Sequence, residues 1–476
     1  MRVLQPLRLR NAEESVASDG QVRPPREWAL PFNLVVTAIL LSLALCIAQF
    51  VLSQTIRTAY PARVKSVRAV LALRQAADSL EPMTAAYQIA TEGGQVDVYQ
   101  EVIRRLKTRF QYSSASLLPI WVWHAAVKLG LPRGLDLAAC FKILSLISLA
   151  IVVLGTARLT VDARTLEGPA RWLWAGAGVV LAASFYPLLQ GFRVGNIQLL
   201  LNAIIVLMIL AWRPDTRGFC GMLAGVLCVY KPHYAILLAW ALVCREYRFA
   251  KYLAGTVAGL IVVSIPLFGA KIYADFLSFL VSMGSRGHAY GPNQSPNGFL
   301  NRFRQDGSWF QVDPLNFARY DPVVAAFTTI VGAALIGGML YWCWKQRRPA
   351  SRLSMAIALV SIILAAPVAW EHHFGFLPAV FALILPYVRT RLQGSLWVGA
   401  YVLGADEFHL SGSTSLWNNL LYSTLLLGTV LLLGLLYRAA RPVAPELVSS
   451  HLETVQNNFL ASGSDAETSD VPQSTR

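Results

Sequence analysis

Residues 31–54 read PFNLVVTAILLSLALCIAQFVLSQ, an apolar run without a single charged side chain. A helix needs about 20 consecutive apolar residues to cross a bilayer. This run is too long and too far from Met1 for a typical cleaved signal peptide, so we interpret it as a signal anchor. Further runs that approach or exceed this length recur along the chain. They predict an all-α, polytopic membrane protein.

The composition also indicates a chain that lies largely in lipid. Hydrophobic residues make up 55% of the 476 residues and charged residues only 14%, whereas soluble domains carry about 25% charged residues. A net charge of +15 would indicate nucleic-acid binding in a soluble protein. Here Lys and Arg cluster in short links between apolar runs, which the positive-inside rule explains. We therefore expect no nucleic-acid partner.

The six cysteines lie inside the apolar runs or at their ends, and none lies in the long polar loops. This placement implies no exported disulfide framework. Their spacing does not match a zinc site. The cysteines are Cys46, Cys140, Cys220, Cys228, Cys244 and Cys343.

The basic links predict the orientation of the chain in the membrane. If both termini are cytoplasmic, every short basic link falls inside, and two large loops, 55–136 and 270–322, fall outside. The domain at 31–441 then holds about twelve spans. It follows a cytoplasmic segment at 1–30 and precedes a disordered cytoplasmic tail at 442–476. The basic links are at 158–171, 213–217, 245–251, 345–352 and 389–391.

Two stretches predict helices that do not simply cross the membrane. Residues 116–130 are apolar but too short for a span, so we expect a re-entrant or interfacial helix. Lys231-Pro232-His233 interrupts an apolar stretch. Because proline bends a helix and lacks a backbone donor, it predicts a broken helix or tight hairpin.

The first large loop contains TEGGQVDVYQEVIRRLKTRFQY at residues 91–112, which predicts an amphipathic helix with a basic side. Asp97 stands where this helix begins. A carboxylate there suits chemistry on an anionic lipid head group beside a membrane-hugging basic helix. The simpler interpretation is that Asp97 only caps the helix.

Further polar residues fall on the same, outer side of the predicted membrane domain. Such groups at membrane depth are functional candidates. Each set also has a structural explanation, such as hydrogen bonds between helices or anchoring to lipid head groups. The candidates are Tyr99, Tyr112, Asn196, Gln198, Lys231, His233, Asn293, Gln294, Arg302, Arg304, Trp370, Glu371, His372 and His373.

The predicted spans contain no Asp or Glu in their interior, which argues against an ion-coupled transporter. An enzyme with a site at the outer face agrees better with this pattern. The adjacent His372 and His373 would point about 100° apart on a helix and make poor joint metal ligands. We expect no metal and no other cofactor.

Taken together, these motifs make the chain resemble glycosyltransferase family 87, multi-span enzymes of the GT-C class. The resemblance extends over most of residues 30–440. The motifs that support it are Asp97-Val-Tyr99, the Tyr112 segment, Gly195-Asn-Ile-Gln198, Lys231-Pro232-His233, Asn293-Gln-Ser295 with Arg302, and Trp370-Glu-His-His373. It implies a GT-C fold and use of a polyprenyl-phosphate sugar, typically mannose, as donor.

The resemblance also implies roles for the candidates. Asp97 would act as the general base on an acceptor hydroxyl, and the anomeric configuration would invert. Arg302, Arg304, Lys231, His372 and His373 would stabilise the donor phosphate. The remaining candidates would bind the sugar or a lipid- or glycan-linked acceptor on the outer face of a plasma or inner membrane.

Two rival classes remain open. A lipid or sugar-lipid transporter would make no bond, and its Asp97 variants would still transport. A GT-C enzyme with a protein acceptor would commonly carry a metal-binding acidic pair, and Asp97-Val-Tyr99 supplies only one carboxylate.

Overall fold

The computed structural model describes residues 29–55, 61–92, 96–130, 136–162, 168–304, 309, 317–346, 350–406 and 415–441. Within these ranges all regular secondary structure is helical, and an isolated β-bridge joins Asn293 to Trp370. The all-α class is therefore confirmed for the described part of the chain. Nearly all of the predicted N-terminal segment and the whole tail at 442–476 lie outside the described residues.

Four helices are long and apolar enough to cross a membrane on their own. They are α1 (Ala29–Thr55), α6 (Leu137–Asp162), α12 (Tyr247–Phe268) and α15 (Pro322–Gln346). Two bent pairs could each form one more span: α7 (Pro169–Ala183) with α8 (Tyr186–Val194), and α19 (Leu416–Tyr422) with α20 (Thr424–Ala439). The described residues thus hold four to six candidate spans, as in a polytopic membrane protein. The count of about twelve spans remains a prediction.

The four long helices carry most of their apolar side chains on the outside of the molecule. In the most apolar stretch of each, only 11% to 22% of the residues are buried. Leu154 of α6 and Ile330 of α15 are both more than half exposed. A soluble monomer rarely exposes so much contiguous apolar surface, whereas lipid tails match it. These helices therefore present their outer faces to lipid.

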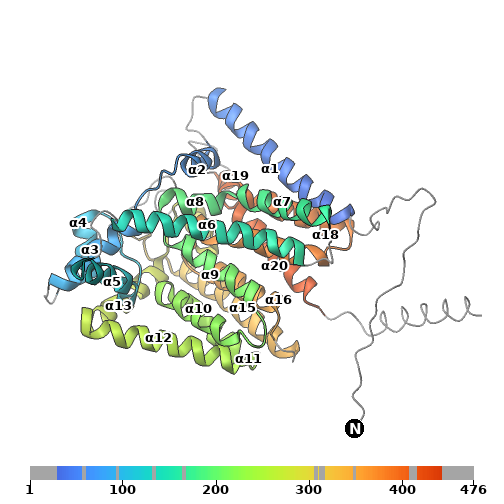
Figure 1. The fold of residues 1–476 in the computed structure, drawn as a ribbon. Coiled ribbons are helices and arrows are strands. Elements are labelled where there is room, and N and C mark those ends of the chain that lie inside the picture. Colours follow the sequence, from blue (N-terminus) through green and yellow to red (C-terminus); the bar gives the residue numbers. More distant parts are fainter. Residues whose placement is uncertain are drawn as a thin grey trace, which may run out of the picture.

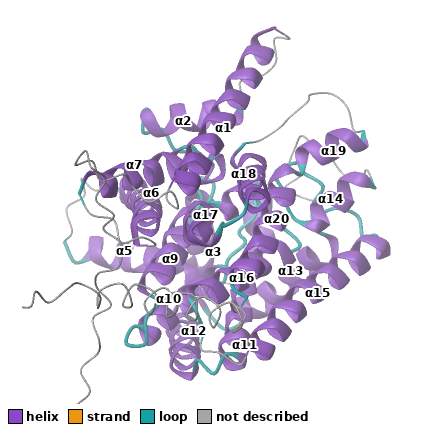
Figure 2. Cartoon of the chain, turned by 90° about the vertical axis from the view of Figure 1, so that its right-hand side faces the viewer, coloured by secondary structure: helices purple, strands orange, loops and turns teal. Residues whose placement is uncertain are grey.

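The core consists of shorter helices, which Figure 2 shows in the middle of the molecule. In α16 (Arg352–Ala365) every residue from Leu353 to Leu364 is buried. Of the other short elements, α9 (Gln198–Ala211), α11 (Ile236–Val243) and α17 (Leu377–Ile384) contact α16. The remaining ones are α10 (Arg217–Tyr230), α18 (Arg391–Ala405) and the 3-10 turn η5 (Leu385–Tyr387). Because this core is apolar all round, the polar groups inside it stand out.

Two predicted departures from simple spans are present. Helix α10 ends at Tyr230, and the 3-10 turn η3 (Pro232–Ala235) precedes α11, so the helix breaks at Lys231 as the sequence predicts. Helix α5 (Leu118–Lys128) follows the turn η2 (Ser114–Leu117) and has 11 residues, too few to cross a bilayer.

The two large loops fold into helices that meet. The first loop forms α2 (Ala62–Leu71), α3 (Leu80–Glu92), α4 (Val98–Leu106) and α5, and the second forms α13 (Lys271–Arg286) and α14 (Pro296–Phe303). Figure 1 shows α3, α4, α5 and α13 gathered at one end of the bundle. Tyr99 of α4 stacks on Phe276 and Phe279 of α13, with ring centroids 5.6 and 5.4 Å apart. The two loops therefore meet at this end of the protein.

A buried ion pair ties α2 to the middle of α1 and to the end of α18. Arg63 Nη1 lies 2.6 Å from Asp406 Oδ1, and both side chains are at most 4% exposed. Ser42 of α1 donates to Asp406 and accepts from Arg63, both at 2.7 Å. Because α1, α2 and the end of α18 meet here, the pair anchors the start of the first loop.

We predict that Arg63→Met lowers the free energy of unfolding by about 3–5 kcal/mol, because Asp406 would stay buried without its counter-charge. The double variant Arg63→Met/Asp406→Leu should recover most of this loss, since apolar replacements of buried pairs are often neutral. Thermal unfolding of the three proteins in detergent measures the effect. A single variant that melts with the wild type would contradict the prediction.

Candidate functional site

Lys231 lies at the break between α10 and η3, and its side chain is buried. Its Nζ atom is 3.3 Å from Nε2 of His373 and 5.5 Å from the centroid of the Tyr112 ring. His372 and His373 belong to the 3-10 turn η4 (Glu371–Phe374) and are also buried. We call Lys231, Tyr112, His372 and His373 the Lys231 centre. Four sequence candidates from three distant segments of the chain thus meet.

Burial determines the protonation of this centre. Loss of hydration lowers the pKa of Lys231 to about 8, while the nearby charge of Asp78 acts in the opposite direction. Burial, together with the charge of Lys231, lowers the pKa of His372 to about 3 and that of His373 well below its ordinary value. Both imidazoles are therefore neutral at pH 7, and Lys231 is the cation among them.

The turn that carries the two histidines is held by amide side chains of α9. Asn202 Nδ2 donates to the backbone oxygen of His372 at 2.9 Å, and Gln198 Nε2 donates to Asn202 Oδ1 at 3.2 Å. Gln198 therefore acts on the Lys231 centre through Asn202. Nε2 of His372 is buried and has no hydrogen-bond partner among the described residues. Such an atom is positioned to meet a bound polar group.

Asp78, which the sequence analysis did not select, lies beside this centre. Asn196 Nδ2 donates to its Oδ2 atom at 2.5 Å, and the backbone N–H groups of Asp78 and Ser79 donate to Val194 and Gly195. The Asp78 side chain stays accessible to solvent. Loss of hydration among the surrounding residues nevertheless raises its pKa, against the Asn196 hydrogen bond and the charge of Lys231.

The close approach at Asp78 requires a glycine. Gly195 has a φ angle of +66°, and a Cβ atom there would lie 1.8 Å from the backbone oxygen of Ala76. This explains why the Gly195-Asn-Ile-Gln198 motif begins with glycine. The motif marked Asn196 as a candidate in the sequence. No motif around Asp78 indicated that this carboxylate would be the partner of Asn196.

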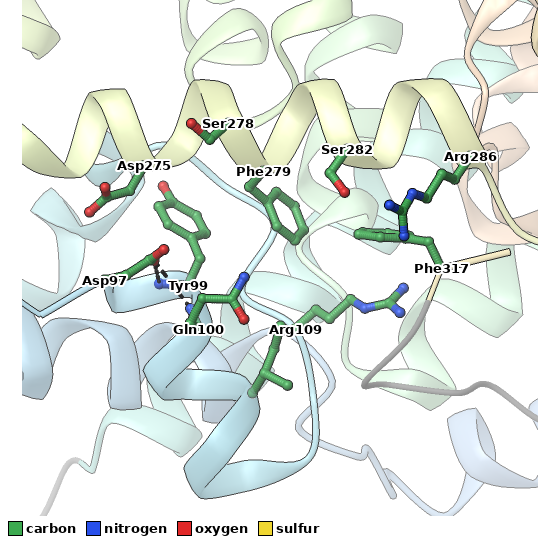
Figure 3. Close-up of a pocket in the computed structure, with 11 residues that line it drawn as sticks. Asp97, Tyr99, Gln100, Arg109, Asp275, Ser278, Phe279, Ser282, Arg286 and Phe317 are labelled. Atoms are coloured by element: carbon green, nitrogen blue, oxygen red, sulfur yellow. Dashed lines mark hydrogen bonds between the residues drawn. The ribbon is translucent and has the colours of Figure 1, made fainter. Parts of the chain in front are cut away.

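Asp97 lies in a separate pocket of about 200 Å³, which Figure 3 shows. Its Oδ1 atom accepts hydrogen bonds from the backbone N–H groups of Tyr99 (2.9 Å) and Gln100 (3.2 Å), so it caps α4. Its Oδ2 atom has no hydrogen bond with a described residue. The carboxylate is thus a cap and also faces a cavity. The pocket is lined by Asp97, Tyr99, Gln100, Ile103, Arg109, Asp275, Ser278, Phe279, Ser282, Arg286 and Phe317.

Tyr99 and Tyr112 link this pocket to the Lys231 centre. The Tyr99 hydroxyl donates to the Tyr112 backbone oxygen at 2.8 Å, and the Tyr112 hydroxyl lies 2.8 Å from Ser79 Oγ. Both side chains are buried. Their hydroxyl groups are hydrogen-bonded to protein atoms. The two buried side chains therefore separate the Asp97 pocket from Lys231 and the two histidines.

The Asn293–Gln294 and Trp370–Glu371 segments pair with each other, as the bridge between Asn293 and Trp370 indicates. Gln294 N–H donates to Ala369 at 2.7 Å, and Glu371 N–H donates to Pro292 at 3.0 Å. This pairing helps to fix η4, which packs against α8 and α9 and brings His373 to Lys231. The side-chain amides of Asn293 and Gln294 donate to the backbone oxygens of His288 and Tyr422.

The two arginines of the second loop have protein partners. Arg302 is fully buried and donates to Asn419 Oδ1 and Ser423 Oγ, both at 2.9 Å. It also donates to backbone oxygens of the loop that contains Asn293. Arg304 pairs with Asp321 at 2.8 Å on the surface. Both arginines hold the loop in this structure, and phosphate binding by either one stays a prediction.

The remaining candidates are sequence neighbours of residues in the Lys231 centre. His233 is half-buried at the start of η3, next to the Tyr234 ring. Trp370 is half-buried, with the rings of His288 and Tyr290 within 6 Å. Glu371 Oε2 accepts from the Tyr186 hydroxyl at 2.6 Å. In the part of the chain that the structure describes, no group of three His, Cys, Asp or Glu side chains is placed to hold a metal ion.

Comparison with known protein families gives a match. The model of glycosyltransferase family 87 matches residues 110–367, more than half of the chain. The matched range includes Tyr112, Asn196 and Lys231 and excludes Asp97 and the Trp370–His373 segment. No curated protein and no solved structure matches. The chain belongs to glycosyltransferase family 87.

Proposed function

We propose that this glycosyltransferase moves a hexose, mannose in the first instance, from a polyprenyl-phosphate sugar to a lipid- or glycan-linked acceptor. The reaction takes place on the outer face of a plasma or inner membrane. The observation that supports it most is the convergence of Lys231, His372 and His373 inside an otherwise apolar helical protein. A lipid-linked donor suits this surrounding because its polyprenyl chain stays in the bilayer.

The donor phosphate is held in this proposal at the Lys231 centre. A phosphate brought next to Lys231 raises the pKa of the ammonium group and keeps it charged. The neutral histidines add N–H donors, including a nitrogen of His372 that has no partner among the described residues. Charge-assisted hydrogen bonds of this kind stabilise the negative charge that develops on a leaving phosphate.

Bond exchange needs a base on the acceptor side. In the proposed step Asp97 takes the proton of the acceptor hydroxyl, and that oxygen attacks the anomeric carbon opposite the phosphate. The bond between the anomeric carbon and the phosphate oxygen breaks, its electron pair stays on the phosphate, and the configuration inverts. The proton ends on Asp97, and polyprenyl phosphate leaves.

The other candidates orient the substrates. Next to the Lys231 centre lie Asn196, Gln198 and His233. In this proposal Asn196 and His233 hydrogen-bond to sugar hydroxyls, and Gln198 acts directly or through Asn202. The remaining group shapes the walls and the loop around the substrates. It comprises Tyr99, Tyr112, Asn293, Gln294, Arg302, Arg304, Trp370 and Glu371.

The rival functions differ in what they produce from the same donor. Membranes that contain the protein are incubated with radiolabelled polyprenyl-phosphate mannose, and the labelled products are separated. A new labelled lipid or glycan supports the proposal, and label in protein indicates the protein-acceptor enzyme. Donor that moves across the bilayer without a new bond indicates a transporter.

The outward orientation predicts that Lys65→Cys reacts with a membrane-impermeant maleimide on intact cells, whereas Lys345→Cys reacts only after lysis. Both side chains are exposed, one in the first loop and one in the most basic link. Wild type controls for labelling of the six native cysteines. If position 345 but not position 65 is labelled on intact cells, the chain has the opposite orientation in the membrane.

Asp97→Asn should lower the transfer rate by about 10²–10⁴-fold, because Asn cannot accept the hydroxyl proton. Asn can still cap α4, so the fold should persist, which a thermal-shift assay checks. Asp78→Asn is the matched comparison, since it changes the carboxylate beside Lys231 in the same way. Normal turnover in Asp97→Asn together with lost turnover in Asp78→Asn would assign the base to Asp78.

Lys231 predicts a pH dependence of transfer. Only the charged ammonium binds phosphate strongly, so kcat/KM of the wild type should fall as the pH rises through about 8. Lys231→Gln should lower kcat/KM by about 10–100-fold at pH 7, because a hydrogen bond to a charged group contributes about 1.5–3 kcal/mol. The variant should also lose the decline near pH 8. A variant profile that keeps this decline would exclude Lys231 as its origin.

A further inference from the structure

The carboxylate of Asp78 has one oxygen held by the protein and one oxygen free. Oδ2 accepts the hydrogen bond from Asn196, whereas Oδ1 accepts none from a described residue. No backbone N–H of the described chain donates to this side chain, so Asp78 caps no helix, in contrast to Asp97. The Asp78 side chain is exposed. The partner of Oδ1 is therefore solvent or a bound substrate.

Asn196 and Ser79 fix the direction of the free oxygen. Oδ1 of Asn196 accepts from the backbone N–H of Gln198 at 2.9 Å, so its Nδ2 atom must face Asp78. The side chain of Ser79 accepts from the Ile197 N–H, also at 2.9 Å. Two consecutive side chains of the first loop are thus bound to the residues that begin α9. They leave Oδ1 of Asp78 as a positioned acceptor.

Asp78 lies beside the cation to which the proposed function assigns the donor phosphate. Tyr112 is the common neighbour, because its hydroxyl lies 2.8 Å from Ser79 Oγ and its ring centroid 5.5 Å from Lys231 Nζ. Among the described residues, the hydrogen bond of Lys231 goes to His373 and not to Asp78. The free oxygen of Asp78 is therefore close to the assigned phosphate, and Lys231 does not occupy it.

The chemistry of an ionised carboxylate restricts its ligand. It accepts hydrogen bonds and donates none, and like charges repel, so it does not bind the phosphate itself. Beside a sugar phosphate it suits a neutral hydroxyl group. The hydroxyl nearest to the phosphate is the one on C2, next to the anomeric carbon. In glycoside cleavage, hydrogen bonds to this hydroxyl strengthen in the transition state, when the anomeric carbon becomes positively charged.

We propose that Asp78 binds the 2-hydroxyl group of the transferred sugar and determines which configuration at C2 the enzyme accepts. The inference rests on the proposed function, from which it takes the phosphate at Lys231. Mannose and glucose differ only in the direction of the 2-hydroxyl, so a fixed acceptor distinguishes them. The negative charge of Asp78 also stabilises the positive charge that develops at the anomeric carbon.

Binding is tested first without turnover, on the full-length protein in detergent. The probes are short-chain polyprenyl phosphates that carry mannose, glucose, or the 2-deoxy sugar that is common to both. Thermal stabilisation gives an apparent Kd for each probe. The 2-deoxy probe should bind wild type about 10–100-fold more weakly than the preferred epimer, as for a lost hydrogen bond to a charged group. This ratio should fall about tenfold in Asp78→Asn, whose amide is neutral, and further in Asp78→Ala.

Glu81→Gln is the matched control. Glu81 is an exposed carboxylate three positions further along the same loop, in the first turn of α3. Its ratio of affinities should equal that of wild type. If Asp78 were only a counter-charge for Lys231, its variants would change the affinity of the hexose and 2-deoxy probes by the same factor. That result, or a wild type that binds both epimers and the 2-deoxy probe alike, would overturn the proposal.

Steady-state transfer separates this inference from the proposed function. The kcat/KM ratio of the preferred hexose donor to the 2-deoxy donor should fall about tenfold in Asp78→Asn. The intrinsic reactivity of the donors cancels, because the same pair is compared in each protein. A wild type that binds the probes with an Asp78-dependent ratio but transfers no label would keep the sugar site and refute the proposed function. Transfer by both proteins with an equal ratio, as for a general base at position 78, would refute the sugar site alone.

Discussion

An ammonium group buried in an apolar helical protein must find polar neighbours or lose its charge, and this constraint organises the polar interior of the protein. Pro232 ends α10 and leaves Lys231 at the break. The neutral His373 lies 3.3 Å away, and Asp78 supplies an opposing charge. The histidines reach this place because the segments at 292–294 and 369–371 hydrogen-bond to each other. The loops outside the core are thus arranged around one buried charge.

The same constraint explains why backbone contacts, and not long side chains, place the acidic partner. Residues 76–79 run along the end of α8 and donate to the carbonyls of Arg193, Val194 and Gly195. Only a residue without a Cβ atom fits at position 195. Asp78 is therefore held by main-chain geometry and by Asn196, and its free edge stays accessible.

The sequence predicted what depends on local pattern. Apolar runs predicted the helical class, and Lys231-Pro232-His233 predicted the break in α10, because both follow from hydrophobicity and proline chemistry. The cap at Asp97 was also visible in the sequence. The sequence did not show which side chains are exposed. Arg302 belongs to a polar loop in the sequence, yet it is fully buried and donates to Asn419 and Ser423. Asp78 was missed because its contact with Asn196 joins residues 118 positions apart, and only the folded chain creates it.

Inversion at a sugar carbon requires the base and the leaving phosphate on opposite sides of that carbon, within the reach of one ring. The structure offers two carboxylates, and each faces its own cations: Asp78 faces Lys231, and Asp97 shares a cavity with Arg109 and Arg286. The buried pair Tyr99 and Tyr112 stands between them. In the proposed reaction the base and the donor phosphate would therefore lie on opposite sides of these two tyrosines.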